Sequence, residues 1–172
     1  MDSDGVFSPR RLSQIAYYNF EETSSQIILV RPTTFEEQAF AIDHLEEYLS
    51  KKVRLVIVDT ITSLYRVEFE AEKIFTLNRE LNRQVACLTQ IAKTHKIAVL
   101  ITSQVRSIFE GLDDVEPVAT RVLMFWSDVV INLKRTGQTR VIRAFLEKHP
   151  TYKRPMSCYI KIEKTGVREF SP

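Results

Sequence analysis

The amino-acid sequence predicts an α/β protein, in which a mostly parallel sheet is flanked by helices and followed by antiparallel strands. Two observations lead to this fold class. Short apolar runs typical of strands alternate with helical patterns over residues 1–104, and short strands follow one another from residue 127 onward. With 44% hydrophobic and 27% charged residues, the chain can also bury a normal core.

A first helix is expected to begin at Ser8 and Pro9, because serine caps helix N-termini and proline is tolerated at the first helical position. The run QIILV at 26–30 then predicts a buried strand. Thr34 and Glu37 have the spacing of a capping box, which predicts the start of the next helix.

A second apolar run, LVIV at 55–58, leads directly to Asp59 and predicts another strand. A long helix is expected over 70–95, where apolar residues recur on one stripe. The run IAVLITSQ at 97–104 is apolar on both faces, which predicts a central parallel strand. Residues 105–120 have the composition of a loop.

The C-terminal part predicts three short strands, in the stretches SDVVINLKR, TRVIRAFLEK and SCYIKIEK. Turns are expected around Gly137 and at Thr165 and Gly166. This part therefore adds antiparallel strands to the sheet.

The composition indicates a single domain in a reducing compartment. Cys87 and Cys158 lie far apart and lack metal-ligand spacing, which suits the cytoplasm. The start MDSDG has no apolar region of the kind found in signal peptides, and no apolar run approaches the length of a membrane span. We therefore expect a cytoplasmic protein without membrane contact.

Charge is unevenly distributed, although the net charge is only +2. From Lys134 to the end there are ten basic and three acidic side chains, so this tail carries +7 and the preceding residues −5. A basic segment of this size is typical of a nucleic-acid contact. A solvated strand face explains it equally well at this stage.

An apolar strand that ends on an acid, as at Asp59, is how many phosphate-handling enzymes hold Mg²⁺. The alternative is that Asp59 only caps the following turn. A phosphate loop of the form G-x-x-x-x-G-K-[ST] would normally accompany such an acid. The four glycines of the chain exclude that loop, because no two of them are closer than 26 residues.

Four stretches together carry a family resemblance. They are MDSDGVFSPRRL, LVIVDTITSLYRVE, VLITSQV, and NLKRTGQTRVIRAFLEKHPTYKRP with YIKIEKTGV. In this order they resemble the RecA/RadA recombinase superfamily, and most closely the archaeal RadB proteins. The resemblance covers nearly the whole chain and implies a single, truncated RecA-like ATPase core domain over residues 1–172.

The resemblance implies a nucleotide site for ATP and Mg²⁺. Asp4 matches the glutamate that activates the attacking water, although it is one methylene shorter. Asp59 matches the acid on the magnesium side, with Thr60 beside it, and Arg11 matches an arginine that stacks on adenine. Gln104 matches a polar residue that senses the γ-phosphate, and a buried glutamine that satisfies a backbone group is its alternative.

The resemblance also implies nonspecific DNA binding. The expected contacts are Arg106, Arg121, Lys148, His149, Lys153 and Arg154. Acidic residues between Arg106 and Arg121 would repel phosphate, so that segment is expected to be a poor contact.

Relatives place a strand and a phosphate loop before the segment that here begins at Met1, so we expect the first strand and the phosphate loop to be missing. The strand at 97–104 would then have an open edge, and such edges recruit other strands. We therefore expect association with a RadA-type recombinase or with a second copy. An incomplete open reading frame of a full DNA-dependent ATPase is the alternative, as is a non-catalytic RecA-fold partner.

Overall fold

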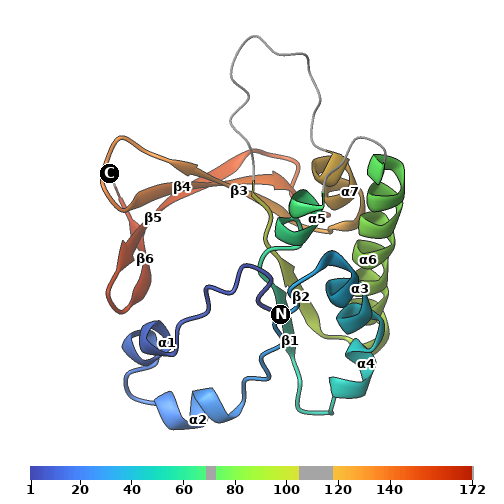
Figure 1. Cartoon of the computed structure of the whole chain (residues 1–172). Helices are drawn as coiled ribbons and strands as arrows, with labels where there is room; N and C mark the ends of the chain where they lie inside the picture. Colours follow the sequence, from blue (N-terminus) through green and yellow to red (C-terminus); the bar gives the residue numbers. More distant parts are fainter. Residues whose placement is uncertain (69–72, 105–117, 172) are drawn as a thin grey trace. The chain divides into compact units, whose positions relative to one another are not determined.

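The computed structural model describes residues 1–68, 73–104 and 118–171, which belong to two compact units (Figure 1). Unit 1 comprises Met1–Val6 and Leu29–Trp126. Unit 2 comprises Phe7–Ile28 and Ser127–Pro172. The prediction of one domain over the whole chain remains a prediction, and each unit is described separately.

Unit 1 pairs two parallel strands with helices. Its elements are α3 (Phe35–Asp43), α4 (Leu45–Tyr48), β1 (Leu55–Val58), α5 (Ser63–Val67), α6 (Ile74–His95), β2 (Ala98–Ile101) and α7 (Val118–Trp126). Strands β1 and β2 are parallel, with Leu55 opposite Ala98 and Val58 opposite Ile101. A parallel bridge between Asp2 and Asp59 extends the pairing on the other side of β1. The predicted strand at 55–58 is thus confirmed. The strand predicted at 97–104 forms over Ala98–Ile101 only, and among the described residues it pairs with β1 alone, so its predicted central position is wrong.

The apolar stripe predicted for the long helix is the core of unit 1. Leu77, Leu81, Val85, Leu88 and Ile91 of α6 are all buried at helical spacing. Val58, Ile61 and side chains of α3 and α7 belong to the same cluster. Helix α6 therefore forms because one of its faces has a core to cover, as its period indicated.

The capping box also forms, with a small shift. Thr34 Oγ1 accepts a hydrogen bond from the Glu37 N–H at 3.1 Å, and Glu37 Oε2 accepts from the Thr33 N–H at 2.7 Å. The hydrogen bonds from the Thr33 N–H and the Thr33 hydroxyl lower the pKa of Glu37, because they stabilise its charged form. The carboxylate thus reaches one residue further back than in the usual box.

The buried strand predicted at 26–30 is wrong. Residues 27–30 have no regular structure, and Ile28 is 60% exposed. Within the described residues, one backbone hydrogen bond joins residues 28–30 to another segment: the Val30 carbonyl accepts from the Asp2 N–H at 2.9 Å. An apolar run becomes a strand only where a neighbour completes its ladder, and one hydrogen bond is not a ladder.

Unit 2 consists of two short helices and an antiparallel sheet. Its elements are α1 (Pro9–Ile15), α2 (Phe20–Ser25), β3 (Val130–Arg135), β4 (Val141–Lys148), β5 (Met156–Glu163) and β6 (Gly166–Phe170), with the strands in the order β3-β4-β5-β6. Ser8 caps α1 as predicted, by accepting from the Arg11 N–H at 3.2 Å. The three predicted strands are confirmed, whereas β6 was not predicted as a separate strand. Gly166, with φ of 129°, makes the turn between β5 and β6.

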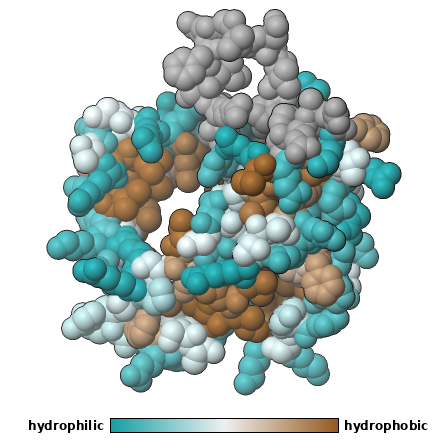
Figure 2. Space-filling model, in the orientation of Figure 1, coloured by the Kyte–Doolittle hydropathy of each residue, from teal (hydrophilic) through white to brown (hydrophobic). Residues whose placement is uncertain are grey.

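The register of this sheet separates two faces. Ile131, Leu133, Met156, Ile162 and Val167 share one face, and each of them is at least 38% exposed. Figure 2 shows apolar surface over this sheet. The other face carries cross-strand neighbours such as Lys134 and Arg143. The sheet is therefore amphipathic, with an apolar face that stays largely uncovered.

No helix in the described ranges is both long enough and apolar enough to span a membrane.

Candidate functional site

The candidate nucleotide site lies where β1 ends in unit 1. Asp59 follows β1 directly, and its carbonyl accepts hydrogen bonds from the N–H groups of Ser3 at 2.8 Å and Asp4 at 3.4 Å. The Thr102 hydroxyl, just beyond β2, donates to Asp59 Oδ1 at 2.5 Å. The backbones of Asp4 and Asp59, which are far apart in sequence, are therefore adjacent at the carboxyl end of the sheet.

The turn after Asp59 is rich in hydroxyl groups. The Asp59–Thr60 peptide bond is cis. Ser63 Oγ donates to the Thr60 carbonyl at 3.1 Å, and Thr62 Oγ1 lies 3.2 Å from Ser103 Oγ. Thr60 Oγ1 is buried and, within the described residues, has no hydrogen-bond partner. A buried hydroxyl without a partner is unusual. This hydroxyl is therefore the group most suited to accept a hydrogen bond from a bound group or to donate one to it.

Charge at this edge is mainly negative. Asp2 is buried, and its carboxylate forms an ion pair with Arg31 at 3.1 Å. Burial lowers the pKa of the Met1 ammonium, an effect that the neighbouring Asp2 and Asp59 carboxylates oppose. The edge therefore favours cations over free anions.

Gln104 is exposed and is held by a side chain from α5. Arg66 Nη1 donates to Gln104 Oε1 at 2.8 Å. The alternative of a buried glutamine that satisfies a backbone group is therefore wrong. Arg66 lies in α5, the short helix that follows the turn after Asp59. Gln104 and this turn are therefore connected through α5.

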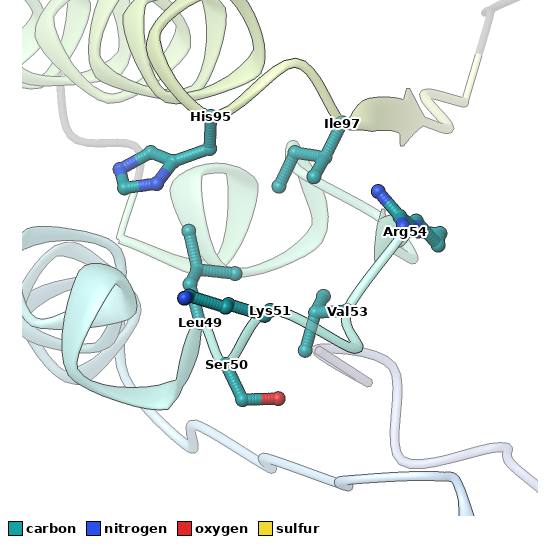
Figure 3. A pocket seen from close by; sticks show the side chains of 7 residues that line it. All are labelled: Leu49, Ser50, Lys51, Val53, Arg54, His95 and Ile97. Carbon is teal, nitrogen blue, oxygen red and sulfur yellow. The ribbon is translucent and has the colours of Figure 1, made fainter.

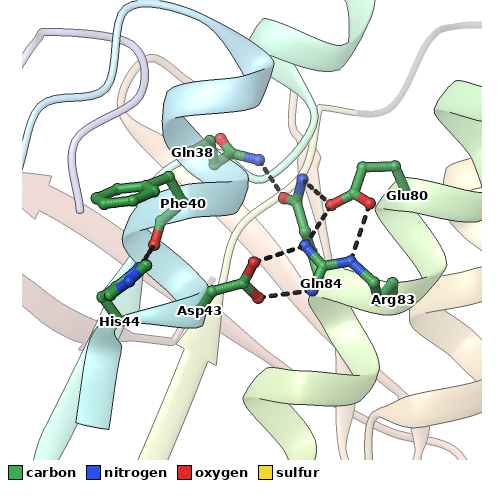
Figure 4. A network of polar contacts seen from close by, with 7 residues as sticks. All are labelled: Gln38, Phe40, Asp43, His44, Glu80, Arg83 and Gln84. Atoms are coloured by element: carbon green, nitrogen blue, oxygen red, sulfur yellow. Dashed lines mark hydrogen bonds and ion pairs between the residues drawn. The ribbon is translucent and has the colours of Figure 1, made fainter. Parts of the chain in front are cut away.

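A buried network that the sequence analysis missed joins the segment of Asp4 to the turn after Asp59, and Figure 4 shows its Gln38–Gln84 part. Ser3 Oγ donates to Gln38 Oε1 at 2.8 Å. Gln38 Nε2 donates to the Ile61 carbonyl at 3.1 Å and to Gln84 Oε1 at 2.8 Å. Gln38 and Gln84 are both 0% exposed. Gln38 thus fastens the residue before Asp4 to the turn that follows Asp59.

A sequence signal for this network existed. Gln84 stands on the apolar stripe of α6 between Leu81 and Val85, and Gln38 lies between the buried Phe35 and Ile42 of α3. A polar residue on an apolar stripe must find a buried partner. The partner's identity was not readable, because it comes from another element.

The oxygen atoms gathered here suit the part of a nucleotide site that holds Mg²⁺. They do not supply the part that holds the phosphates. Asp59 could hold Mg²⁺ through water, with Thr60 and Thr102 supplying hydroxyl groups. In the described parts of the chain, no cluster of three His, Cys, Asp or Glu side chains could hold a metal ion. The 172 residues contain no glycine-rich phosphate cradle. No catalytic step through ATP therefore follows from these residues.

Arg11, the expected adenine contact, is engaged within unit 2. Its guanidinium donates to the carbonyls of Glu163, at 2.7 Å, and Lys164. It also donates to Gln14 Oε1 at 3.2 Å. Arg11 therefore ties α1 to the turn between β5 and β6, and its stacking on adenine remains a prediction.

The expected DNA contacts of the tail surround the turn after β4. Lys148 ends β4, and His149 Nδ1 accepts from the N–H groups of Thr151 and Tyr152, both at 3.1 Å. The His149 ring also lies 4.8 Å from the Tyr152 ring. Lys153 and Arg154 follow in this turn and are exposed. His149 thus shapes the turn that presents these cations to solvent.

The other two expected DNA contacts come earlier in the sequence. Arg121 lies on α7 of unit 1 and is exposed. Arg106 and the acidic residues between it and α7 lie outside the described residues. The segment after Pro117 is a helix, in which Val122 is buried, Phe125 is 72% exposed, and Trp126 Nε1 donates to Asn82 Oδ1 at 2.9 Å.

Comparison with known proteins shows which family the chain belongs to. The Rad51 family model matches residues 1–170. The DNA repair and recombination protein RadB of Methanosphaera stadtmanae is 32% identical over 171 residues, which cover 97% of this chain and 72% of that protein. The RadB protein of Methanocaldococcus jannaschii is 36% identical over 151 residues, with 87% and 69% covered.

A solved structure gives the same result. The crystal structure of the RadB recombinase superimposes with a TM-score of 0.81 at 29% identity, and the match covers 99% of this chain and 77% of that one. The RecA-like α/β fold expected from the sequence is confirmed by this likeness. The chain therefore belongs to the Rad51 family of RecA-like proteins, among its RadB members.

Proposed function

We propose that this protein acts in DNA repair and homologous recombination as a RadB-like accessory protein. The observation that carries the proposal is the match of nearly the whole chain to proteins named DNA repair and recombination protein RadB. In this role it binds DNA nonspecifically, associates with a RadA-type recombinase, and does not hydrolyse ATP by itself. Its free cysteines, Cys87 and Cys158, suit action in the cytoplasm.

The absence of autonomous ATP hydrolysis is supported by the donor set. Asp59 and Thr60 supply groups for the magnesium side, whereas no residues of the chain form a glycine-rich phosphate cradle. Asp4 is also shorter than the glutamate of the family. Phosphate release from ATP should be measured with the purified chain, with and without DNA, next to Asp59→Ala. DNA-stimulated turnover that Asp59→Ala abolishes would contradict the proposal.

Nonspecific DNA binding is supported by the basic tail and its exposed cations. If Lys148, Lys153, Arg154 and one further cation neutralise about four phosphates, log affinity should fall with log salt at a slope of about −3 to −4. Fluorescence anisotropy with an arbitrary DNA oligonucleotide measures both quantities. Changing Lys148, Lys153 and Arg154 together to alanine should weaken binding and flatten the slope.

A control for that variant is Arg10→Ala with Arg79→Ala, because both arginines are exposed and neither belongs to the basic tail. An affinity that does not change with salt, or a triple variant that binds like the control, would refute the tail as the DNA contact.

Association with a RadA-type recombinase or with a second copy is supported by exposed apolar surface. Side chains on one face of the antiparallel sheet, including Ile131, Leu133 and Val167, are more than half exposed. Leu100 on β2 is 51% exposed as well. Surfaces of this kind usually mark a partner site. Light scattering at micromolar concentration, with and without the recombinase, tests the association, and a stable monomer that ignores the recombinase would refute it.

A further inference from the structure

A pocket of about 380 Å³ opens at the amino ends of β1 and β2 in unit 1, at the end opposite to Asp59 (Figure 3). Aliphatic side chains of Leu49, Val53 and Ile97 line part of it. Ser50 and the basic residues Lys51, Arg54 and His95 line the rest, and Figure 3 shows the three basic residues on different sides of the pocket. The pocket therefore combines an aliphatic floor with a rim of basic groups.

Local structure keeps this rim in place. Ser50 Oγ accepts from the Lys52 N–H at 3.3 Å, and the Val53 N–H donates to the Ser50 carbonyl at 3.0 Å. The Arg54 carbonyl accepts from the Ala98 N–H at 3.0 Å, which joins the loop to the start of β2. The turn that carries Lys51 and Arg54 is thus tied to the sheet.

The lysines and the arginine around the pocket form no ion pair with an acidic side chain among the described residues. Lys51, Lys52 and Arg54 belong to the loop before β1, and Lys93 and Lys96 belong to the C-terminal turn of α6. In the described part of the chain none of these five forms an ion pair, whereas His95 Nε2 lies 3.1 Å from Glu46 Oε1. The negative end of the α6 dipole favours Lys93 and Lys96 at this position. The five cations outnumber Glu46 and Glu47 of the preceding α4, so this end of the strands is net basic.

The chemistry of the pocket favours phosphate groups. Arginine and lysine are the side chains that bind phosphate most often, and the fork of a guanidinium matches two phosphate oxygens. None of the residues that line the pocket is a Phe, Tyr or Trp on which a base could stack. Contacts without stacking or base readout go to the nucleic-acid backbone and do not depend on sequence.

We propose that the pocket with Lys51 and Arg54 binds phosphate groups of a nucleic-acid backbone, as a contact on unit 1 additional to the basic tail of unit 2. This inference rests on the DNA binding proposed above. The chain would then contact some DNA phosphates through unit 1 and others through the basic tail of unit 2.

The test measures anisotropy of a labelled single-stranded DNA oligonucleotide with the full 172-residue chain across a salt series. Each phosphate contact that is lost should flatten the log–log salt slope by about 0.7 and weaken binding about fivefold at 0.1 M salt. Arg54→Ala should show this change, and Lys51→Ala with Arg54→Ala about twice the slope change. Arg54→Lys should keep most of the slope, because it keeps the charge.

Arg79→Ala is the matched control, since Arg79 is an exposed arginine of the same unit on α6, outside the pocket lining. Thermal melting of each variant checks that the fold is kept. An Arg54→Ala slope equal to that of Arg79→Ala would overturn the inference and leave the proposed DNA binding intact.

Two further outcomes are distinguishable. If Arg54→Ala left DNA affinity unchanged but abolished binding of polyglutamate, the pocket would be a site for acidic protein segments and the inference would be wrong. If the unaltered chain bound no DNA at all, the proposed function would fail before any variant was compared, and the ligand proposed here would fail with it.

Discussion

The two units differ sharply in what holds them together. Of the buried apolar side chains among the described residues, all but Val141 belong to unit 1. Unit 1 therefore depends on burial, which is the dominant favourable term in folding. Unit 2 depends more on the hydrogen-bonded ladders of a four-stranded sheet, one of whose faces is apolar and exposed. Substitutions of core residues should consequently be more costly in unit 1 than substitutions of apolar sheet residues in unit 2.

The largest expected effect is that of a core truncation in unit 1. Leu81 on α6 is 0% exposed, so Leu81→Ala leaves a cavity and should lower the free energy of unfolding by about 2–5 kcal/mol. Ile162→Ala in the sheet of unit 2, where Ile162 is 38% exposed, should cost less than about 1 kcal/mol. Urea unfolding followed by far-UV circular dichroism measures both. If both substitutions lowered the free energy of unfolding equally, the proposed difference in how the two units are stabilised would be wrong.

A slightly smaller loss of stability is expected when the buried network of Gln38 and Gln84 in unit 1 is broken. Gln38→Leu leaves the Ile61 carbonyl and Gln84 Oε1 without their donor, which should cost about 2–3 kcal/mol. Trp126 is the single tryptophan of the chain and lies in unit 1, so its fluorescence follows this unit. The control is Gln90→Leu, at an exposed position of α6. If Gln90→Leu were as costly as Gln38→Leu, the network would not be what stabilises this region.

In unit 2 a backbone effect should exceed any effect of packing. Gly166 has a φ of 129°, which side-chain-bearing residues rarely adopt, so Gly166→Ala should destabilise by about 1–2 kcal/mol. Gly137→Ala is the control in another turn of the same sheet, where an added Cβ would meet nothing within 4 Å. Thermal unfolding by circular dichroism measures the pair. A neutral Gly166→Ala would mean that this turn adapts without strain.

The smallest expected effect depends on pH. Arg83 donates to Glu80 and Asp43, and its hydrogen bond with Glu80 lowers the pKa of that carboxyl. Because the folded-state pKa lies below the unfolded value, the stabilisation is complete above the ordinary pKa and is lost as pH falls through the folded-state pKa. Arg83→Met should therefore cost about 0.5–1 kcal/mol at pH 7, in line with exposed ion pairs, and less at pH 3.

Urea unfolding of Arg83→Met and the unaltered chain at both pH values measures this difference. Arg79→Met serves as the control, because Arg79 lies on the same helix and has no ion pair among the described residues. A difference between Arg83→Met and the unaltered chain that stays constant down to pH 3 would show that Glu80 is not its source.

By itself, the sequence determined the features of this protein that depend on near neighbours in the chain. The stripe of α6, the caps at Ser8 and Thr34, and the strand that leads to Asp59 all follow from periodicity and side-chain chemistry within a few residues. The family motifs have the same character, because each is a short contiguous stretch. Such features were readable since local spacing alone selects between a helix, a strand and a turn.

Only the tertiary structure decided what depends on contacts between distant residues. The run at 26–30 lacks a strand because no ladder completes it, and the partner of the exposed Gln104 is Arg66, which reaches it from α5. Gln38 joins the segments of Asp4 and Asp59 across α3, and the pocket at Lys51 and Arg54 exists because β2 starts beside the loop before β1. These features form between segments far apart in the sequence, and a local pattern carries no record of which segments will meet.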